Sequence, residues 1–166
     1  METHCLSLAA VRSRGRTLKL RTRESARERL HRYPDCSTRL MHAARILVVD
    51  DHLTTRQALG TILRQEGYEV REASAAEEAL DLLRAFEPNL ILSDLHMPRI
   101  DGATFLEMAR ESGCSASFVL MTSLTHEEVA AAAMRSGAAQ CLHKPLDIDV
   151  LLGVVQQELQ RTRATQ

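Results

Sequence analysis

The most informative segment of the sequence is RILVVDDHLTTRQAL, residues Arg45–Leu59. Four apolar residues, Ile46 to Val49, run directly into two adjacent carboxylates, Asp50 and Asp51. An apolar, β-branched run of this length predicts a buried strand. Two like charges at the end of a buried strand repel each other unless a cation lies beside them. The acidic pair therefore predicts a cation-binding site at the end of this strand.

Beyond this strand, short apolar runs alternate with segments of helical periodicity. We predict strands over residues 45–49, 68–72, 89–93, 117–121 and 139–142, and helices over 54–66, 74–87, 103–111, 125–136 and 147–161. Short connections between alternating strands and helices favour parallel βαβ units, with helices on both faces of one sheet. The sequence thus predicts an α/β domain with a doubly wound, five-stranded parallel sheet and five helices.

Two of these helices carry specific local signals. The helix over 54–66 has an apolar face at the i, i+3 and i+4 spacing, made of Ala58, Leu59, Ile62 and Leu63. The next helix begins at Ser74, which we expect to be its N-cap, with Glu77 completing a capping box.

Polar residues follow four of the five predicted strands. In a sheet of this type, ligands bind beyond the carboxyl ends of the strands. The residues at those ends are Asp50 and Asp51, Asp94, Thr122 and Ser123, and Lys144 with Pro145. Three carboxylates, hydroxyls and one ammonium are therefore expected on one rim.

The residue types on this rim indicate a particular chemistry. Clustered carboxylates need a divalent cation to neutralise them, and an all-oxygen ligand set favours Mg²⁺ or Mn²⁺ over zinc. Lys144 and the Thr122 hydroxyl would then contact the oxygens of a phosphoryl group. One carboxylate remains to act as a nucleophile, as aspartyl-phosphate chemistry requires. The acidic pair is thus interpreted as holding a metal that in turn holds a phosphate.

The net charge of −1 divides into two unlike parts. Residues 1–44 carry ten Lys and Arg against four Asp and Glu, and residues 45–166 carry eleven against eighteen. We expect 1–44 to be a disordered basic leader, because its high charge and few large apolar residues cannot repay the entropy of ordering. The alternatives are an arm that binds nucleic acid or an anionic membrane, an organelle transit peptide, or translation that starts at Met41.

Other features of composition exclude several classes of protein. No apolar run approaches the roughly 20 residues that span a bilayer. The four cysteines are scattered without a CxxC pair, so neither a zinc site nor a disulfide framework is indicated. We therefore expect a cytoplasmic protein without a membrane segment.

Four segments together resemble the receiver domain of bacterial two-component response regulators. They are ILVVDDH at the first strand, ILSDLHMPRIDG at the third, VLMTS at the fourth and CLHKPLD at the fifth. The resemblance covers residues 45–162, with 163–166 as a frayed end. It implies a flavodoxin-like fold with strand order 2-1-3-4-5.

The resemblance also implies a role for each residue on the rim. Asp94 would be the phosphoacceptor, and Thr122 and Lys144 would contact the phosphoryl group. Mg²⁺ would be held by Asp50, Asp51, Asp94 and the main-chain carbonyl of His96. The Lys144–Pro145 peptide bond would be cis, and Gly102 would permit a tight turn after Asp94. We do not expect the side chains of His52, His96, His126 or His143 to be metal ligands.

Two further positions affect what is expected of the protein: one departs from the family pattern, and the other bears on the rate of self-dephosphorylation. Cys141 stands three residues before Lys144, where the family usually has Tyr or Phe, so a switch based on an aromatic side chain is not expected. Leu124 lies near the expected path of an attacking water and cannot orient it, which predicts slow self-dephosphorylation. The Ala-rich helix 125–136 is either a docking surface or simply a good helix former.

The resemblance implies a stand-alone regulator, monomeric or weakly dimeric, that is phosphorylated by a histidine kinase or a histidine phosphotransfer protein. It would signal by binding a downstream protein or by phosphorelay, because no DNA-binding domain is evident. It would not be an enzyme, since it would catalyse only its own phosphoryl transfer and slow dephosphorylation. The alternatives are a docking protein that needs no phosphorylation, a haloacid-dehalogenase-type phosphatase, a flavodoxin-like carrier and a nucleic-acid binder that uses the leader.

Overall fold

The computed structural model describes residues 43–124, 131 and 134–164. The leader up to residue 42 and most of the helix expected over 125–136 lie outside this range, as do Met41 and His126. The described part of the chain begins at Ala43, two residues before the first strand.

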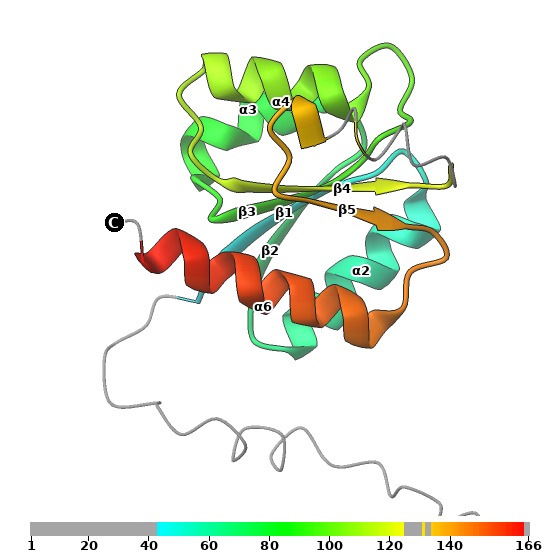
Figure 1. Cartoon of the computed structure of the whole chain (residues 1–166), viewed down its shortest axis with the longest axis vertical. Helices are drawn as coiled ribbons and strands as arrows, with labels where there is room; N and C mark the ends of the chain where they lie inside the picture. Colours follow the sequence, from blue (N-terminus) through cyan, green and yellow to red (C-terminus); the bar gives the residue numbers. More distant parts are fainter. Residues whose placement is uncertain (1–42, 125–130, 132–133, 165–166) are drawn as a thin grey trace, which may run out of the picture. The chain divides into compact units, whose positions relative to one another are not determined.

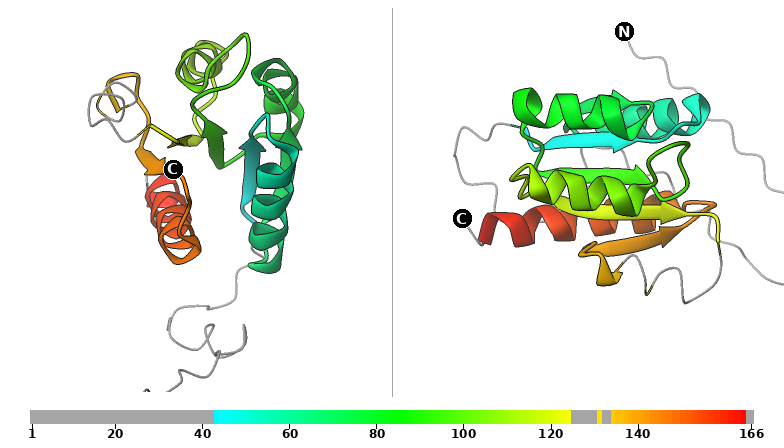
Figure 2. Two further views of the ribbon diagram at one scale, coloured as in Figure 1. Left: turned by 90° about the vertical axis from the view of Figure 1, so that its right-hand side faces the viewer. Right: turned by 90° about the horizontal axis from the view of Figure 1, so that it is seen from above.

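Five parallel strands form one sheet, in the order β2-β1-β3-β4-β5. This order confirms the predicted 2-1-3-4-5 arrangement. The arrowheads of the strands point to the same side of the sheet (Figure 2), so their carboxyl ends share one edge. The strands are β1 Arg45–Val49, β2 Glu69–Ala73, β3 Leu90–Asp94, β4 Ser117–Thr122 and β5 Gln140–His143.

Helices cover both faces of the sheet (Figure 1). On one face lie α3, Ala76–Phe86, and α4, Gly102–Glu111; on the other lie α2, Leu53–Gln65, and α6, Ile148–Ala164. The predicted doubly wound architecture is therefore confirmed, with four helices in the described part of the chain. None of the helices described there is long and apolar enough to cross a membrane.

The sequence of β1 explains how the sheet holds two layers of helices. Its side chains alternate between the faces, so Leu47 and Val49 join the apolar cluster beneath α3 and α4, whereas Ile46 and Val48 join the cluster beneath α2 and α6. All four are fully buried. A strand buried on both faces must be continuously apolar, which is why the polar residues are found only where the strand ends.

The apolar face of α2 is narrower than predicted. Leu59 and Leu63 are buried against the sheet and Ile62 is partly buried, but Ala58 is exposed. The two buried leucines are four residues apart and define the line of contact. Ala58 lies one residue before Leu59, which turns it toward solvent.

The predicted capping box of α3 is wrong in its register. The N-cap is Ala75, and Glu78 rather than Glu77 reaches back to Ser74. Glu78 accepts hydrogen bonds from both the main-chain N–H and the hydroxyl of Ser74, each at 2.7 Å. These bonds lower the pKa of Glu78, the main-chain bond more strongly. Glu77 instead forms an ion pair with Arg99, at 3.3 Å.

Gly102 is required for a different reason from the one predicted. Its φ is not in the positive region, and it is the first residue of α4, after the N-cap Asp101. A Cβ at this position would collide with the main-chain oxygen of Asp94 and lie 3.0 Å from the Cα of Leu95. The absence of a side chain thus allows the start of α4 to approach the end of β3.

The close approach at Gly102 predicts that Gly102→Ala destabilises the domain. The added methyl group meets main chain, which cannot move aside without shifting β3, so we expect a loss of about 1–3 kcal/mol in the free energy of unfolding. Urea denaturation would measure it. Gly153→Ala in α6 is the matched control, because nothing lies within 4 Å of its Cβ position and alanine in a helix gains about 0.5–1 kcal/mol. Equal effects of the two substitutions would contradict this role.

Candidate functional site

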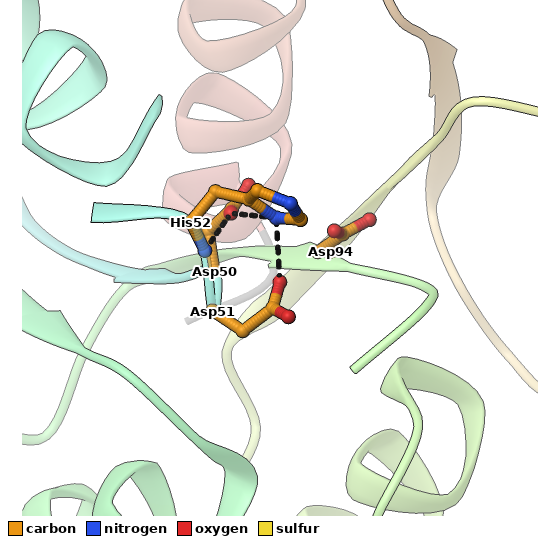
Figure 3. Close-up of side chains that lie close together, drawn as sticks. All are labelled: Asp50, Asp51, His52 and Asp94. Carbon is orange, nitrogen blue, oxygen red and sulfur yellow. Dashed lines mark hydrogen bonds and ion pairs between the residues drawn. The ribbon is translucent and has the colours of Figure 1, made fainter. Parts of the chain in front are cut away.

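The carboxyl edge of the sheet gathers the charged residues predicted from the sequence. Asp50 follows β1, Asp94 is the last residue of β3, and Lys144 follows β5. Figure 3 shows the side chains of Asp50 and Asp51 together with His52 and Asp94 at this edge. Residues far apart in the chain thus share one site, because parallel strands end at the same edge.

Lys144 bridges two buried carboxylates. Its Nζ lies 2.9 Å from Oδ2 of Asp50 and 3.0 Å from Oδ2 of Asp94. The Asp50 side chain is fully buried and that of Asp94 is only 6% exposed. Burial is the largest single influence on the pKa of Lys144 and would lower it, but the hydrogen bonds to Asp50 and Asp94, together with the negative charges of these carboxylates, outweigh burial and raise that pKa. The lysine is therefore held as an ammonium between two carboxylates.

Asp51 has a different environment from its neighbour. Its side chain is 27% exposed, and its Oδ1 lies 2.8 Å from Nδ1 of His52. The main-chain N–H of His52 donates to Oδ1 of Asp50 at 2.8 Å, which orients that buried carboxylate. Asp51 is thus the more exposed member of the pair, whereas Asp50 is fully buried.

The donor set fits a divalent cation. Asp50, Asp51, His52 and Asp94 each offer a ligand atom, and these atoms all lie within 4.8 Å of one another. Three carboxylates carry three negative charges, of which the Lys144 ammonium neutralises one. A hard, oxygen-binding ion such as Mg²⁺ suits the remaining charge and the ligand type. His96 is exposed, and its N–H lies 3.4 Å from Oδ1 of Asp94; a role for its carbonyl stays a prediction.

Thr122 ends β4 beside these groups and is fully buried. Its hydroxyl oxygen accepts a hydrogen bond from the main-chain N–H of Leu124 at 3.1 Å. A hydroxyl that accepts one bond keeps its own proton to donate. The main-chain oxygen of Thr122 accepts from the N–H of Lys144 at 2.7 Å, so β4 and β5 are joined where they enter the site. The Lys144–Pro145 bond is cis, as predicted.

One residue of the site was not recognised in the sequence. Arg56, in the first turn of α2, donates from Nη1 to the main-chain oxygen of Asp50 at 2.6 Å. Its Nε lies 3.9 Å from Oε2 of Glu72 on β2. Its side chain is only 13% exposed. The available signal was an arginine one helical turn after the acidic pair, which by itself does not distinguish a site residue from a surface charge.

The remaining predicted positions lie beside the site. Cys141 is partly buried against the apolar cluster beneath α3 and α4, and burial raises the pKa of its thiol. His143 is exposed, with Nδ1 3.0 Å from the main-chain oxygen of Leu124, and so faces away from the carboxylates. Most of the Ala-rich helix 125–136 lies outside the described residues.

Comparison with known protein families matches residues 46–156 to the response regulator receiver domain. The chain belongs to this family. Membership of this family excludes two of the alternative functions, a haloacid-dehalogenase-type phosphatase and a flavodoxin-like carrier. Receivers are signalling domains of two-component systems, so this chain belongs to a class that is defined by signalling and not by turnover of a substrate.

Individual relatives agree with this assignment. An uncharacterized 14.6 kDa protein of Leptolyngbya boryana is 41% identical over 114 residues, which are 68% of this chain and 87% of that protein. The regulatory protein AtoC of Escherichia coli is 36% identical over 116 residues, 70% of this chain but only 25% of AtoC. The chain therefore spans about a quarter of that relative. The CheY-like receiver domain structure from Methanospirillum hungatei superimposes with a TM-score of 0.71 at 28% identity, covering 75% of this chain and 100% of that one.

The crowded carboxylates of this receiver predict that Asp51→Asn stabilises the metal-free protein. Like charges about 4–5 Å apart repel by a few kcal/mol at a protein-like effective dielectric, and the pairing with His52 offsets part of this. We expect a gain of roughly 1 kcal/mol in the free energy of unfolding, measured by urea denaturation in EDTA.

The same substitution should weaken the stabilisation that Mg²⁺ gives to the wild-type protein, because a ligand that binds the native state stabilises it. Asp81→Asn is the control, since it removes an exposed carboxylate of α3 outside the site. An Asp51→Asn variant that is destabilised in EDTA, or that gains as much from Mg²⁺ as wild type, would refute this account.

Proposed function

We propose that this receiver accepts a phosphoryl group on Asp94 in a Mg²⁺-dependent reaction, from a histidine kinase or a histidine phosphotransfer protein. The observation that carries the proposal is the position of Asp94, whose Oδ2 lies 3.0 Å from the Lys144 ammonium within a group of three carboxylates. Such a group is suited to hold a metal and a phosphate together.

In the proposed reaction, an oxygen of the Asp94 carboxylate forms a bond to phosphorus. The phosphorus–nitrogen bond of the donor phosphohistidine breaks, and its electron pair returns to the imidazole of the donor. The Asp94 side chain is only 6% exposed, so charges that develop on the transferring group interact with their neighbours at a low effective dielectric, where electrostatic contacts are strong. Asp50, Asp51, Asp94 and the carbonyl of His96 would hold Mg²⁺ or Mn²⁺, which would supply positive charge to the reaction.

Lys144 and Thr122 have separate proposed roles. Lys144 is anchored by Asp50 at 2.9 Å, so its ammonium stays in place when the charge of Asp94 is used in bonding. It then neutralises charge on the phosphoryl oxygens. The Thr122 hydroxyl donates to another of these oxygens, and since it also accepts from the N–H of Leu124, this contact couples the phosphate to the loop after β4.

We further propose that the phosphorylated receiver acts by binding a downstream protein or by passing the phosphoryl group to another histidine. It would do so in the cytoplasm, as a stand-alone monomer or weak dimer. The domain organisation, with a basic leader over 1–44, the receiver over 45–162 and a short frayed end over 163–166, belongs to the same proposal.

A second candidate function is docking that does not depend on phosphorylation. The observation that favours it is Cys141, which fills the position of the usual aromatic residue in β5 with a small, partly buried thiol. Such a side chain cannot report phosphorylation by swinging between buried and exposed positions. The two candidates differ in whether Asp94 is modified at all.

The proposal predicts that acetyl phosphate with Mg²⁺ adds one phosphoryl group to the wild-type chain. Intact-mass spectrometry would measure it, and Asp94→Asn should remain unmodified because an amide is not a nucleophile of this kind. Asp101→Asn is a suitable control, because it removes the carboxylate at the N-cap of α4 and leaves all three carboxylates of the site in place. This variant should be phosphorylated like wild type. Phosphoryl addition to Asp94→Asn, or none to a folded wild-type protein that binds Mg²⁺, would contradict the proposal. The second result would favour the docking function.

The proposal also predicts a long-lived phosphoryl group. Leu124 is 40% exposed beside Thr122 and has no group that orients an attacking water. We therefore expect slow self-dephosphorylation of the wild-type protein and a shorter lifetime for Leu124→Glu, whose carboxylate can accept a proton from water. The decay of the phosphorylated mass after removal of acetyl phosphate gives both lifetimes. A short wild-type lifetime that Leu124→Glu leaves unchanged would rule out this role.

A further inference from the structure

His52 is the one member of the cluster at the carboxyl edge that has no part in the proposed chemistry. Its ring is 71% exposed, yet it does not extend freely into solvent. Nδ1 lies 2.8 Å from Oδ1 of Asp51 and 3.6 Å from Oδ1 of Asp50. Figure 3 shows the ring on the same side of β1 as the carboxylates, facing toward Asp94.

These distances fit two neighbouring ligands of one metal ion. Ligand atoms bonded at about 2.1 Å in an octahedral or tetrahedral shell are separated by roughly 3–3.5 Å when adjacent and by about 4.2 Å when opposite. The nitrogen-to-oxygen distances from His52, 2.8 and 3.6 Å, lie close to the range for adjacent ligands. The ligand atoms of all four residues lie within 4.8 Å of one another, which is also enough for two of them to lie on opposite sides of an ion. The imidazole can therefore complete a shell of three carboxylates without a change of fold.

We propose that His52 supplies a nitrogen ligand when this site holds a transition ion, and so shifts the selectivity of the receiver from Mg²⁺ toward ions such as Co²⁺ and Zn²⁺. Imidazole adds affinity for these ions and little for Mg²⁺, which prefers oxygen and keeps its waters. This inference rests on the proposed function for the position of the metal, and it assigns to His52 a role beyond that function.

The exposure of the ring supports this role. A ring that is 71% exposed contributes little to the core, so its orientation toward Asp51 is not imposed by packing. The backbone before it is fixed on both sides: the N–H of His52 donates to Asp50, and Arg56 holds the main-chain oxygen of Asp50. The side chain is thus presented to the cluster from a rigid segment but can rotate by the small amount that coordination needs.

The test is metal binding by the full chain without any phosphodonor, in wild type, His52→Gln and His143→Gln. His143 is the matched control, because its imidazole is also exposed at this end of the sheet but bonds to the Leu124 main chain. Calorimetry gives the affinities for Co²⁺ and Mg²⁺. Pulsed electron paramagnetic resonance of bound Mn²⁺ shows whether a nitrogen nucleus is bonded directly to the ion.

We expect nitrogen coupling in wild type and His143→Gln and none in His52→Gln. We also expect His52→Gln to bind Co²⁺ at least about tenfold more weakly than wild type does, with Mg²⁺ affinity unchanged. Removal of a residue that only orients a metal ligand already weakens metal binding by about tenfold, and loss of a ligand should weaken it no less. Absence of nitrogen coupling in wild type, its persistence in His52→Gln, or an equal loss of Co²⁺ and Mg²⁺ affinity would overturn the proposal. The last result would mean that His52 only orients Asp51 by a hydrogen bond.

Failure of this inference is distinguishable from failure of the proposed function. Nitrogen coupling depends on the metal and on His52, and it does not require that Asp94 accept phosphate. Conversely, phosphorylation of Asp94 in the presence of Mg²⁺ with no nitrogen coupling would leave the proposed function intact and remove the role of His52 alone.

Discussion

The ammonium of Lys144 between Asp50 and Asp94 is the interaction on which the site depends. Two carboxylates that are almost inaccessible to water are tolerated because one lysine lies 2.9 and 3.0 Å from them. Removal of one partner from a buried ion pair costs about 3–5 kcal/mol in general, because the remaining charge is left without compensation. The three residues come from the ends of β1, β3 and β5, so the pairing is possible only if the strands are parallel and ordered as they are. The chemistry and the topology of this receiver are therefore specified together.

The ion pair leaves negative charge uncompensated, and this residual charge is what equips the site to bind a cation. A rim with three carboxylates and one ammonium is less stable than one with balanced charges, in the way that functional sites often are. Asp51 contributes most of this uncompensated charge, since it is the partly exposed member of the group. Binding of a divalent ion to the native state would return stability to the domain. A site of this kind is poised to respond to a ligand, because its stability depends on occupancy.

The sequence sufficed for the fold and the charged rim, and it failed in local details that depend on side-chain reach. Asp50, Asp94 and Lys144 could be placed because each follows an apolar run, and the ends of parallel strands must meet at one edge. The partner of Ser74 could not be placed, because Glu77 and Glu78 differ by one residue and the helix begins at Ala76. Gly102 was recognised as necessary, but the reason, its contact with the main chain of Asp94, is a tertiary one. Arg56 was missed because its contact with the site is a hydrogen bond to the main-chain oxygen of Asp50, which no residue type reveals.

In the proposed reaction Asp94, and not one of its acidic neighbours, becomes an acyl phosphate. The most direct measurement is borohydride reduction of the chain after treatment with acetyl phosphate and Mg²⁺, followed by peptide mass spectrometry. Reduction converts a phosphoaspartate to homoserine and leaves free aspartates unchanged, so it marks the modified residue itself. The account predicts homoserine in place of Asp94 alone. Homoserine in place of Asp50 or Asp51 would contradict it, since Asp94 would then not be the nucleophile that Lys144 holds in place.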